Sequence, residues 1–411
     1  MSLNSQVSAE RLHIGFFGMR NAGKSSVVNA VTNQNLSVVS DVLGTTTDPV
    51  QKAMEILPLG PVVIIDTPGF DDEGDLGQKR VKKTKEILEK TDIAVLVVDS
   101  VNGLNELDKK LLDLFNERKL PYIVALNKKD LLDTESEKLK NDKALIGDGK
   151  WIDVSAETKE NIYELKEMLS GFAKEKKSDK KVISDLIRPE DVVIAVIPID
   201  ESAPKGRLIL PQQIMIRDVL DAHSKVICCQ VEELKDTIDV LKNPPKMVVT
   251  DSQAFEKVSK IVPEDIMLTS FSILFARYRG DLETLVKGAK KLGELKDGET
   301  VIISEACTHQ RQCNDIGTVK LPGWIEKFSN AKPVYEFTSG GTFVEDFSDV
   351  SLIVHCGGCM INEKAMQHRI ETAKRAGVPI VNYGIAIAHM NGILKRTLEP
   401  FPEREILNKT N

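Results

Sequence analysis

The stretch that decides the fold is HIGFFGMRNAGKS, residues 13–25. An apolar run leads into GMRNAGKS (18–25), which matches the pattern G-x-x-x-x-G-K-[ST]. Between a strand and a helix, such glycines let the backbone fold around phosphates, so that amide N–H groups face the anion. We expect Lys24 to reach the β- and γ-phosphates and Ser25 to ligate Mg²⁺. The alternative is a turn that merely joins strand and helix, and the complete match argues against it.

Two motifs downstream complete a magnesium and γ-phosphate site. GTTTDP (44–49) lies where a threonine must close on the metal, and Thr46 is the candidate. DTPG (66–69) ends an apolar run, so Asp66 is expected to hold Mg²⁺ through water and the Gly69 amide to meet the γ-phosphate. Lys24, Thr46, Asp66 and Gly69 are therefore the predicted catalytic residues.

A third motif selects the base. NKKD (127–130) follows another apolar run, and a carboxylate at Asp130 can accept two hydrogen bonds from guanine N1 and N2. Adenine offers no such pair of donors, so the motif indicates GTP. SAE (155–157) has the position and type of the loop that backs the base. The predicted nucleotide contacts are Gly18, Asn21, Ala22, Gly23, Lys24, Ser25, Ser26, Thr46, Asp66, Gly69, Asn127, Lys128, Asp130, Ser155 and Ala156.

The rest of the chain continues the alternation of apolar runs and amphipathic stretches. This rhythm predicts an α/β fold, with a doubly wound parallel sheet in the first third and ligands at the carboxyl ends of the strands. At 411 residues the chain is too long for one ordinary core. We expect a P-loop GTPase domain (1–173), a lysine-rich linker (174–181), a small α/β domain (182–265) and a last α/β domain (266–411).

Composition narrows the class of function. The net charge of -7 and the pI near 5.6 argue against nucleic-acid binding through bulk charge. No apolar run reaches the roughly 18 residues that span a bilayer. Residues 1–10 lack the features of a secretory signal. We therefore expect a cytoplasmic protein with neither nucleic acid nor membrane as partner. In the reducing cytosol, paired thiols more often bind metal or do redox work than form structural disulfides.

Five residues near the C-terminal end form a pattern of metal-ligand type. After Cys307 and His309 come 45 intervening residues and then His355, Cys356 and Cys359. Both groups end predicted strands, which can meet at one edge of a sheet. The ligand types suit a structural zinc site or an iron–sulfur cluster, and the C-x-x-C spacing suits a redox disulfide. Spacing alone leaves these readings open, together with unliganded thiols.

Two further cysteines, Cys228 and Cys229, lie in the apolar run KVICCQ. We expect both to be small buried side chains without a metal.

The GTPase motifs resemble those of the TrmE and Era group of translation-factor GTPases over residues 10–172. In that group, the P-loop asparagine and the loop before the threonine pair cradle a potassium ion. Asn21 and residues 41–46 match, which implies potassium-stimulated hydrolysis, although Thr47 stands where the group has arginine. Phe70 follows Gly69 where Ras-like enzymes carry glutamine, so hydrolysis is expected to be slow without such help.

Over its entire length the chain resembles the maturation GTPases of [FeFe]-hydrogenase, the HydF family. The resemblance implies a [4Fe–4S] cluster on Cys307, Cys356 and Cys359, with His309 or His355 as fourth ligand or as a group behind the ligands. It implies a scaffold that carries a diiron precursor and delivers it to the apo-hydrogenase, with GTP as a switch. Radical-SAM maturases would be further partners, and the middle domain would form a homodimer.

Two other functions stay open. One is a tRNA-modification or ribosome-assembly GTPase with a structural zinc site, against which the acidic pI counts. The other is an electron-transfer enzyme regulated by GTP.

Overall fold

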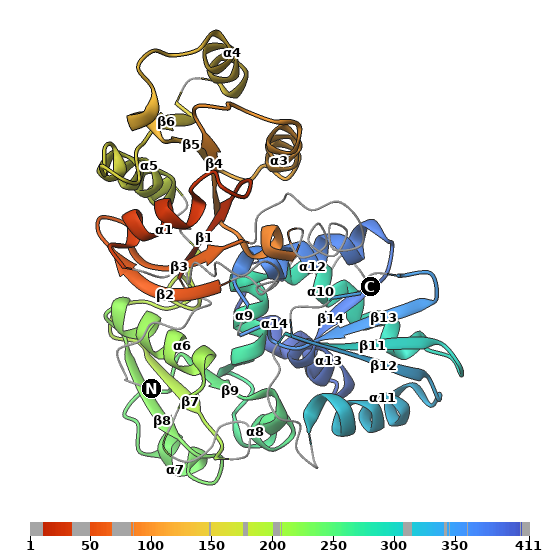
Figure 1. Ribbon diagram of the computed structural model, residues 1–411. Helices are drawn as coiled ribbons and strands as arrows, with labels where there is room; N and C mark the ends of the chain where they lie inside the picture. The colour runs from red at the N-terminus through yellow and green to blue at the C-terminus, as the bar shows by residue number, and fades with distance from the viewer. Residues whose placement is uncertain are drawn as a thin grey trace. The chain divides into compact units, whose positions relative to one another are not determined.

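The computed structural model describes residues 11–34, 50–67, 84, 86–147, 149–175, 180–199, 206, 208–306, 315–340, 343–344, 346–359, 361–402 and 404. The chain divides into two compact units, residues 1–178 and 179–411. Among the described residues, the first unit holds one β-sheet and the second holds two (Figure 1). The predicted α/β class, with a P-loop GTPase domain followed by further α/β domains, is confirmed.

The first unit is built on a six-stranded sheet in the order β2-β3-β1-β4-β5-β6. Only β2 runs antiparallel to its neighbour, β3, and the other pairs are parallel. The strands are β1 (Leu12–Phe17), β2 (Val50–Ile56), β3 (Gly60–Asp66), β4 (Ile93–Asp99), β5 (Tyr122–Asn127) and β6 (Trp151–Asp153). The central strands read as continuous apolar runs because helices cover both faces of the sheet.

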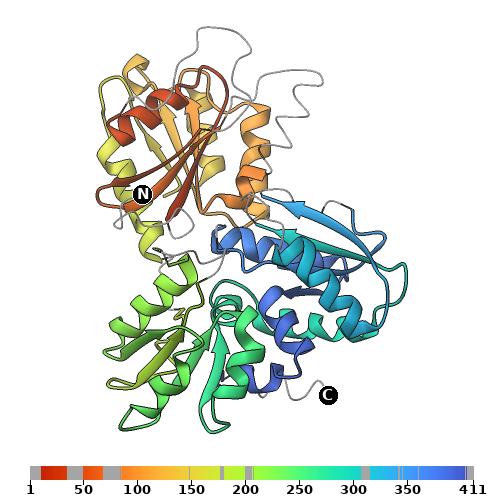
Figure 2. The same cartoon turned by 90° about the horizontal axis from the view of Figure 1, so that it is seen from below.

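Helices on the two faces of this sheet form separate cores. Helix α1 (Lys24–Thr32) and α5 (Ile162–Glu175) bury valine and leucine side chains against one face. Helix α3 (Glu106–Glu117) packs Leu111, Leu112 and Phe115 against the other. A short η2 (Lys129–Leu131) and α4 (Glu137–Ile146) connect β5 to β6. The layering of helix, sheet and helix is visible in the second view (Figure 2).

The second unit holds two parallel four-stranded sheets over one continuous apolar core. The first has the order β10-β9-β7-β8, and the second has the order β12-β11-β13-β14. The strands are β7 (Val192–Val196), β8 (Lys225–Cys229), β9 (Met247–Thr250), β10 (Met267–Ser270), β11 (Thr300–Glu305), β12 (Val334–Ser339), β13 (Val350–His355) and β14 (Ile380–Asn382).

Helix α9 (Phe271–Arg279) links these two sheets. It follows β10 directly and packs against α6, α10, α12 and α13. The helices of this unit are α6 (Leu210–Asp221), α7 (Leu234–Asp239), η3 (Ser252–Ala254), α8 (Phe255–Ile261), α9, α10 (Leu282–Ala289), η4 (Lys290–Glu294), η5 (Ile316–Lys320), α11 (Leu321–Ser329), α12 (Glu363–Arg375), α13 (Tyr383–Met390) and α14 (Leu394–Leu398). No helix in the described ranges is long and apolar enough to cross a membrane.

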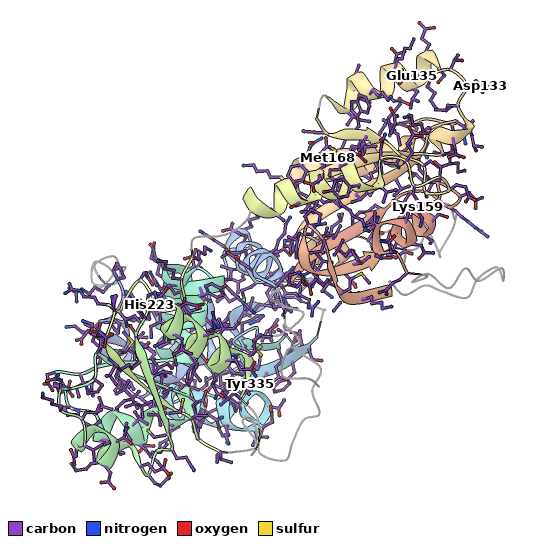
Figure 3. All side chains as sticks on the ribbon, turned by 90° about the vertical axis from the view of Figure 1, so that its left-hand side faces the viewer. Asp133, Glu135, Lys159, Met168, His223 and Tyr335 are labelled. Atoms are coloured by element: carbon purple, nitrogen blue, oxygen red, sulfur yellow. The ribbon has the colours of Figure 1, made fainter. Side chains whose placement is uncertain are left out.

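The expectation that Cys228 and Cys229 are both buried is wrong for Cys228. Cys229 is buried, but Cys228 is exposed on β8, which is the edge strand of its sheet. The turn before β8 passes through His223, which has a left-handed backbone (φ 57) (Figure 3). At the edge of the other sheet, the Tyr335 hydroxyl in β12 donates to the Pro322 carbonyl at 3.1 Å and ties the strand to α11.

Candidate functional site

The P-loop connects β1 to α1 by a tight backbone turn. Gly23 immediately precedes α1 and has a left-handed backbone (φ 81). A Cβ atom added there would lie 2.2 Å from the Asn127 side-chain nitrogen. Glycine is therefore required both by the conformation and by the close approach of β5. The motif has the strand–loop–helix context that phosphate binding needs.

Three polar side chains meet at the N-terminus of α1. Lys24 is almost fully buried, and its Nζ lies 3.8 Å from Asp66 Oδ1. The Ser25 hydroxyl donates to Asp66 Oδ2 at 3.2 Å. Burial raises the pKa of Asp66, while Lys24 and Ser25 lower it. Asp66 Oδ1 is buried and has no hydrogen-bond partner among the described residues, as expected of an atom that would meet a metal-bound water.

Asn127 ties the phosphate side of the site to the base side. Its Nδ2 donates to the Ala22 carbonyl at 3.0 Å, and its Oδ1 accepts from the Ala156 amide at 3.0 Å. Lys128 has a left-handed backbone, and its Nζ pairs with Asp99 Oδ2 at 2.7 Å. Sequence reasoning missed Asp99, although it ends β4 as Asp66 ends β3.

The structure also describes five of the other predicted nucleotide contacts. Gly18 follows β1 with a φ of 142°, and Asn21 is an exposed residue with a φ of 64°. Ser26 and Asp130 are exposed, and Ser155 is buried. Thr46 and Gly69 lie outside the described residues, so two of the four predicted catalytic residues have no described position. The functional roles of all these residues stay predictions.

The second candidate site lies at the carboxyl edge of the β12-β11-β13-β14 sheet. The chain leaves β11 toward β12 on one side, and β13 then pairs with β11 on the other. Such a reversal of strand order opens a crevice at the carboxyl ends of the two central strands. Ser304 pairs with His355, and the Cys356 amide donates to the Ser304 carbonyl at 2.9 Å. The HCGGC segment thus begins beside the end of β11.

Two backbone amides point at the sulfur of Cys356. The Ala306 N–H donates to Cys356 Sγ at 3.1 Å, and the Gly358 N–H donates to it at 3.4 Å. Ala306 is the residue before Cys307, so the sequence carries the third cysteine of the pattern one residue beyond this contact. Cys307 and His309 themselves lie outside the described residues. Within the described ranges, no group of three or more His, Cys, Asp or Glu side chains is arranged to hold a metal ion.

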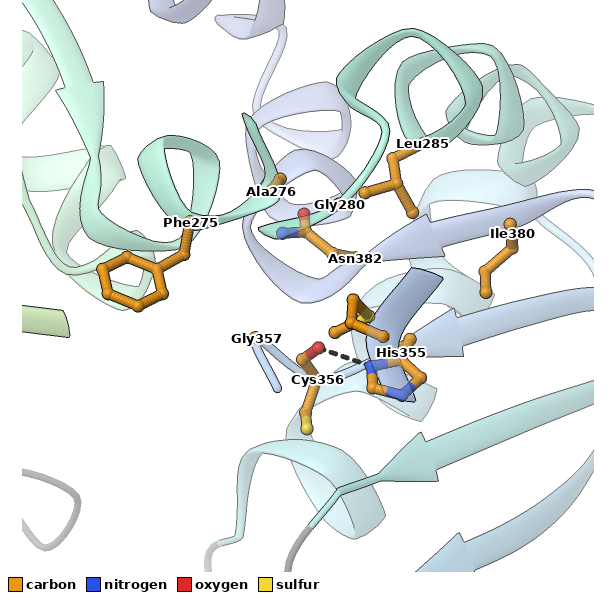
Figure 4. Close-up of a pocket in the computed structure, with 10 residues that line it drawn as sticks. Phe275, Ala276, Gly280, Leu285, His355, Cys356, Gly357, Ile380 and Asn382 are labelled. Carbon is orange, nitrogen blue, oxygen red and sulfur yellow. Dashed lines mark hydrogen bonds between the residues drawn. The ribbon is translucent and has the colours of Figure 1, made fainter. Parts of the chain in front are cut away.

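A small pocket lies behind Cys356. It is lined by side chains of α9, α10, α12 and the sheet, among them Phe275, Leu285 and Ile380 (Figure 4). Burial, together with the neighbouring Cys356, raises the pKa of the Cys359 thiol to about 11 against the opposing effect of Arg279. An apolar wall of this kind disfavours charged thiolates unless a cation or a metal offsets them.

His355 is buried, and both of its ring nitrogens are engaged. Its Nδ1 lies 2.6 Å from the Cys356 carbonyl oxygen (Figure 4). Its Nε2 lies 2.9 Å from Nη1 of Arg369. Because a guanidinium can only donate, Nε2 must accept and Nδ1 must carry the proton. In this arrangement His355 has no free lone pair for a metal.

Two buried arginines in this region were not predicted from the sequence. Arg369 in α12 contacts His355, and it also donates to the Gly340 carbonyl at 2.7 Å. Arg279 at the end of α9 contacts the HCGGC segment. Each lies in a helical stretch with other charged residues, and only the fold reveals which of these charges is buried.

Three family models match successive parts of the chain. A model described as 50S ribosome-binding GTPase matches residues 13–128. The hydrogen maturase F dimerization domain matches residues 182–280, and the hydrogen maturase F tetramerization domain matches residues 283–400.

Individual relatives and solved structures match parts of the chain. GTPase Der of Campylobacter concisus is 38% identical over 135 residues, which are 32% of this chain and 29% of the relative. The tRNA modification GTPase MnmE of Desulforamulus reducens is 30% identical over 175 residues, which are 42% of this chain and 37% of the relative. The chain therefore spans about a third of the length of these curated relatives. The crystal structure of an Aquifex aeolicus Era variant matches with 15% identity and a TM-score of 0.35, over 80% of this chain and 92% of that chain.

Two adjoining domain models of hydrogen maturase F, preceded by a GTPase domain model, identify the chain. The chain belongs to the hydrogen maturase F family and carries a GTPase domain followed by a dimerization and a tetramerization domain.

Proposed function

We propose that the protein is a GTP-hydrolysing iron–sulfur scaffold in the maturation of [FeFe]-hydrogenase. It would carry a diiron precursor and deliver it to the apo-hydrogenase, with radical-SAM maturases as further partners. Membership of the hydrogen maturase F family supports the role in maturation. The observation that carries the iron–sulfur part is the pair of amides directed at Cys356 Sγ from the ends of two neighbouring strands.

The donor set suits a [4Fe–4S] cluster on Cys307, Cys356 and Cys359. Thiolates are the ligands that these clusters take, and N–H groups directed at the sulfurs tune their reduction potential. When bound, the cluster would supply an iron site at which the precursor can be held. The contribution of the described residues is to present two thiols and two amides at a sheet edge, backed by an apolar pocket.

His355 is proposed to orient the loop behind the cluster and not to ligate iron. Its Nδ1–H group donates to the carbonyl of Cys356, and Arg369 occupies its Nε2. Histidines that support a metal site commonly act through such a contact with a backbone carbonyl. His309 is the other histidine of the pattern, and we propose it as the fourth ligand.

GTP hydrolysis is assigned to the first unit. The contacts of Lys24 and Ser25 with Asp66 support the proposal that these three residues bind phosphate and Mg²⁺, and Thr46 and Gly69 are proposed to complete the site. Asn21 is exposed, in keeping with a potassium ligand supplied from the P-loop. We expect slow hydrolysis that K⁺ stimulates and Na⁺ does not, and loss of the stimulation in Asn21→Ala.

The two sites lie in different compact units, so we infer that GTP acts as a switch for partner release and does not drive cluster chemistry directly. The dimerization domain model supports a homodimer formed through the middle of the chain. The tetramerization domain model adds a higher assembly. The boundaries 1–173, 174–181, 182–265 and 266–411 remain our proposal for the domains.

Metal and sulfide content after anaerobic reconstitution tests the proposal. We expect about four irons and four sulfides per chain, with an EPR signal on reduction. Cys356→Ser should lose the cluster and keep GTP hydrolysis, because the two sites are in different units. One zinc without sulfide would instead favour the RNA-linked GTPases. Loss of both activities in Cys356→Ser would contradict the separation of the sites.

A further inference from the structure

A buried arginine at the end of α9 lies against the proposed cluster loop. The side chain of Arg279 is 2% exposed. Its Nη1 donates to the carbonyls of Gly358 and Cys359, both at 3.3 Å, and of Ile361 at 3.0 Å. Three carbonyls of one loop therefore converge on a single nitrogen. These three contacts hold the loop against the guanidinium.

Arg279 is itself held on two further sides. The Gln367 side chain in α12 donates to the carbonyls of Arg279 and Gly280 at 2.9 and 2.8 Å, which fixes the end of α9. The guanidinium carbon lies 5.2 Å from the centre of the Phe275 ring, a cation–π contact within the same helix. Backbone and side chain are thus both constrained, as a residue that positions another group requires.

The conformation of the loop depends on the same contacts. Gly358 has a left-handed backbone (φ 62), and a Cβ atom there would lie 2.2 Å from Cε of Met366. The carbonyl of Gly358 faces Arg279, while its amide N–H faces Cys356 Sγ. Arg279 therefore binds the carbonyl of Gly358, and the amide of the same residue contacts Sγ of Cys356, a proposed ligand.

The charge of Arg279 also suits this place. An arginine guanidinium is charged at neutral pH, and Arg279 places that charge among the carbonyls of the loop. A cluster held by three thiolates carries net negative charge. A cation buried in the wall of its site offsets that charge in a region of low dielectric constant.

We propose that Arg279 is a positioning residue that holds the Cys356–Cys359 loop in its ligating conformation and offsets the negative charge of the bound cluster. This inference rests on the proposed iron–sulfur function. Its structural consequence is that the cluster site takes an essential cation from the segment matched by the dimerization domain, residues 182–280.

The test compares full-length wild type with Arg279→Gln, Arg279→Lys and Arg277→Gln after anaerobic reconstitution. Arg277 lies on the same helix and pairs instead with Asp185 at 2.6 Å, so it is the matched control. The measurements are iron and sulfide content and the midpoint potential from an EPR-monitored redox titration.

Arg279→Gln should shift the midpoint potential to more negative values, because a lost positive charge favours the oxidised cluster. Arg279→Lys keeps the charge but cannot reach all three carbonyls, so it should retain a potential near that of wild type at reduced iron content. Arg277→Gln should match wild type in both.

Wild-type potential and iron content in Arg279→Gln would overturn the inference. If that variant does not fold, Arg279→Lys decides: reduced iron content supports the inference, and wild-type content overturns it. A wild-type protein that takes up no iron and sulfide would refute the proposed function itself, which separates the two failures.

Discussion

Replacing Asn127 by alanine should loosen the nucleotide site before any nucleotide binds. Asn127 is 3% exposed and makes two hydrogen bonds, to the Ala22 carbonyl and from the Ala156 amide, each 3.0 Å long. The substitution leaves both backbone groups without this partner, and each such loss costs about 1–3 kcal/mol. The two losses together should lower the free energy of local opening by about 3 kcal/mol. This corresponds to roughly 100-fold faster exchange of the backbone amide hydrogens.

Hydrogen–deuterium exchange of the full-length, nucleotide-free protein measures this effect in peptides that cover residues 18–30 and 150–160. Asn127→Asp keeps the acceptor for the Ala156 amide and loses the donor to Ala22, so its effect should be concentrated in the first peptide. Asn102→Ala is the control, because the exposed side chain of Asn102 donates one hydrogen bond, to Asp99 Oδ2 at 3.0 Å. Unchanged exchange in Asn127→Ala would refute the claim that Asn127 joins the two loops.

Three further outcomes are expected. Asp130→Asn should weaken GTP binding and favour xanthine nucleotides in competition assays, and unchanged GTP affinity would contradict the base assignment. Burial raises the pKa of Asp108 from 3.8 to about 6, so its proton is held more tightly in the folded state. The stability of α3 should therefore fall as the pH rises from about 4 to about 6, by up to about 3 kcal/mol. In hydrogen–deuterium exchange at matched pH, the amides of α3 should exchange more slowly in Asp108→Asn than in wild type above pH 6. Near pH 4 the two proteins should exchange at the same rate. Nitrogen NMR should show the Nδ1–H tautomer of His355 and its loss in Arg369→Met; the opposite tautomer in wild type would overturn the proposed orientation.

The sequence by itself determined the class of the first unit and the identity of its central residues. A P-loop is a local structure: eight consecutive residues specify the glycines, the lysine and the hydroxyl that phosphate binding needs. The carboxyl ends of the parallel strands then bring Asp66 and Asn127 to the same edge, because each motif directly follows an apolar run. The alternating pattern also predicted β11 and β13, which end one or two residues before their cysteines.

The tertiary structure decided which groups act on those residues. Asp99 reaches Lys128 across neighbouring strands, and Arg279 meets a loop 79 residues away in the chain. No pattern of local spacing encodes such contacts, because they depend on how helices pack over a sheet. Sequence left His355 open as a ligand or a supporting group, and only the buried Arg369 beside it separates the two readings. Cys228 looked buried from its apolar neighbours, and only the strand order revealed that it stands on an edge.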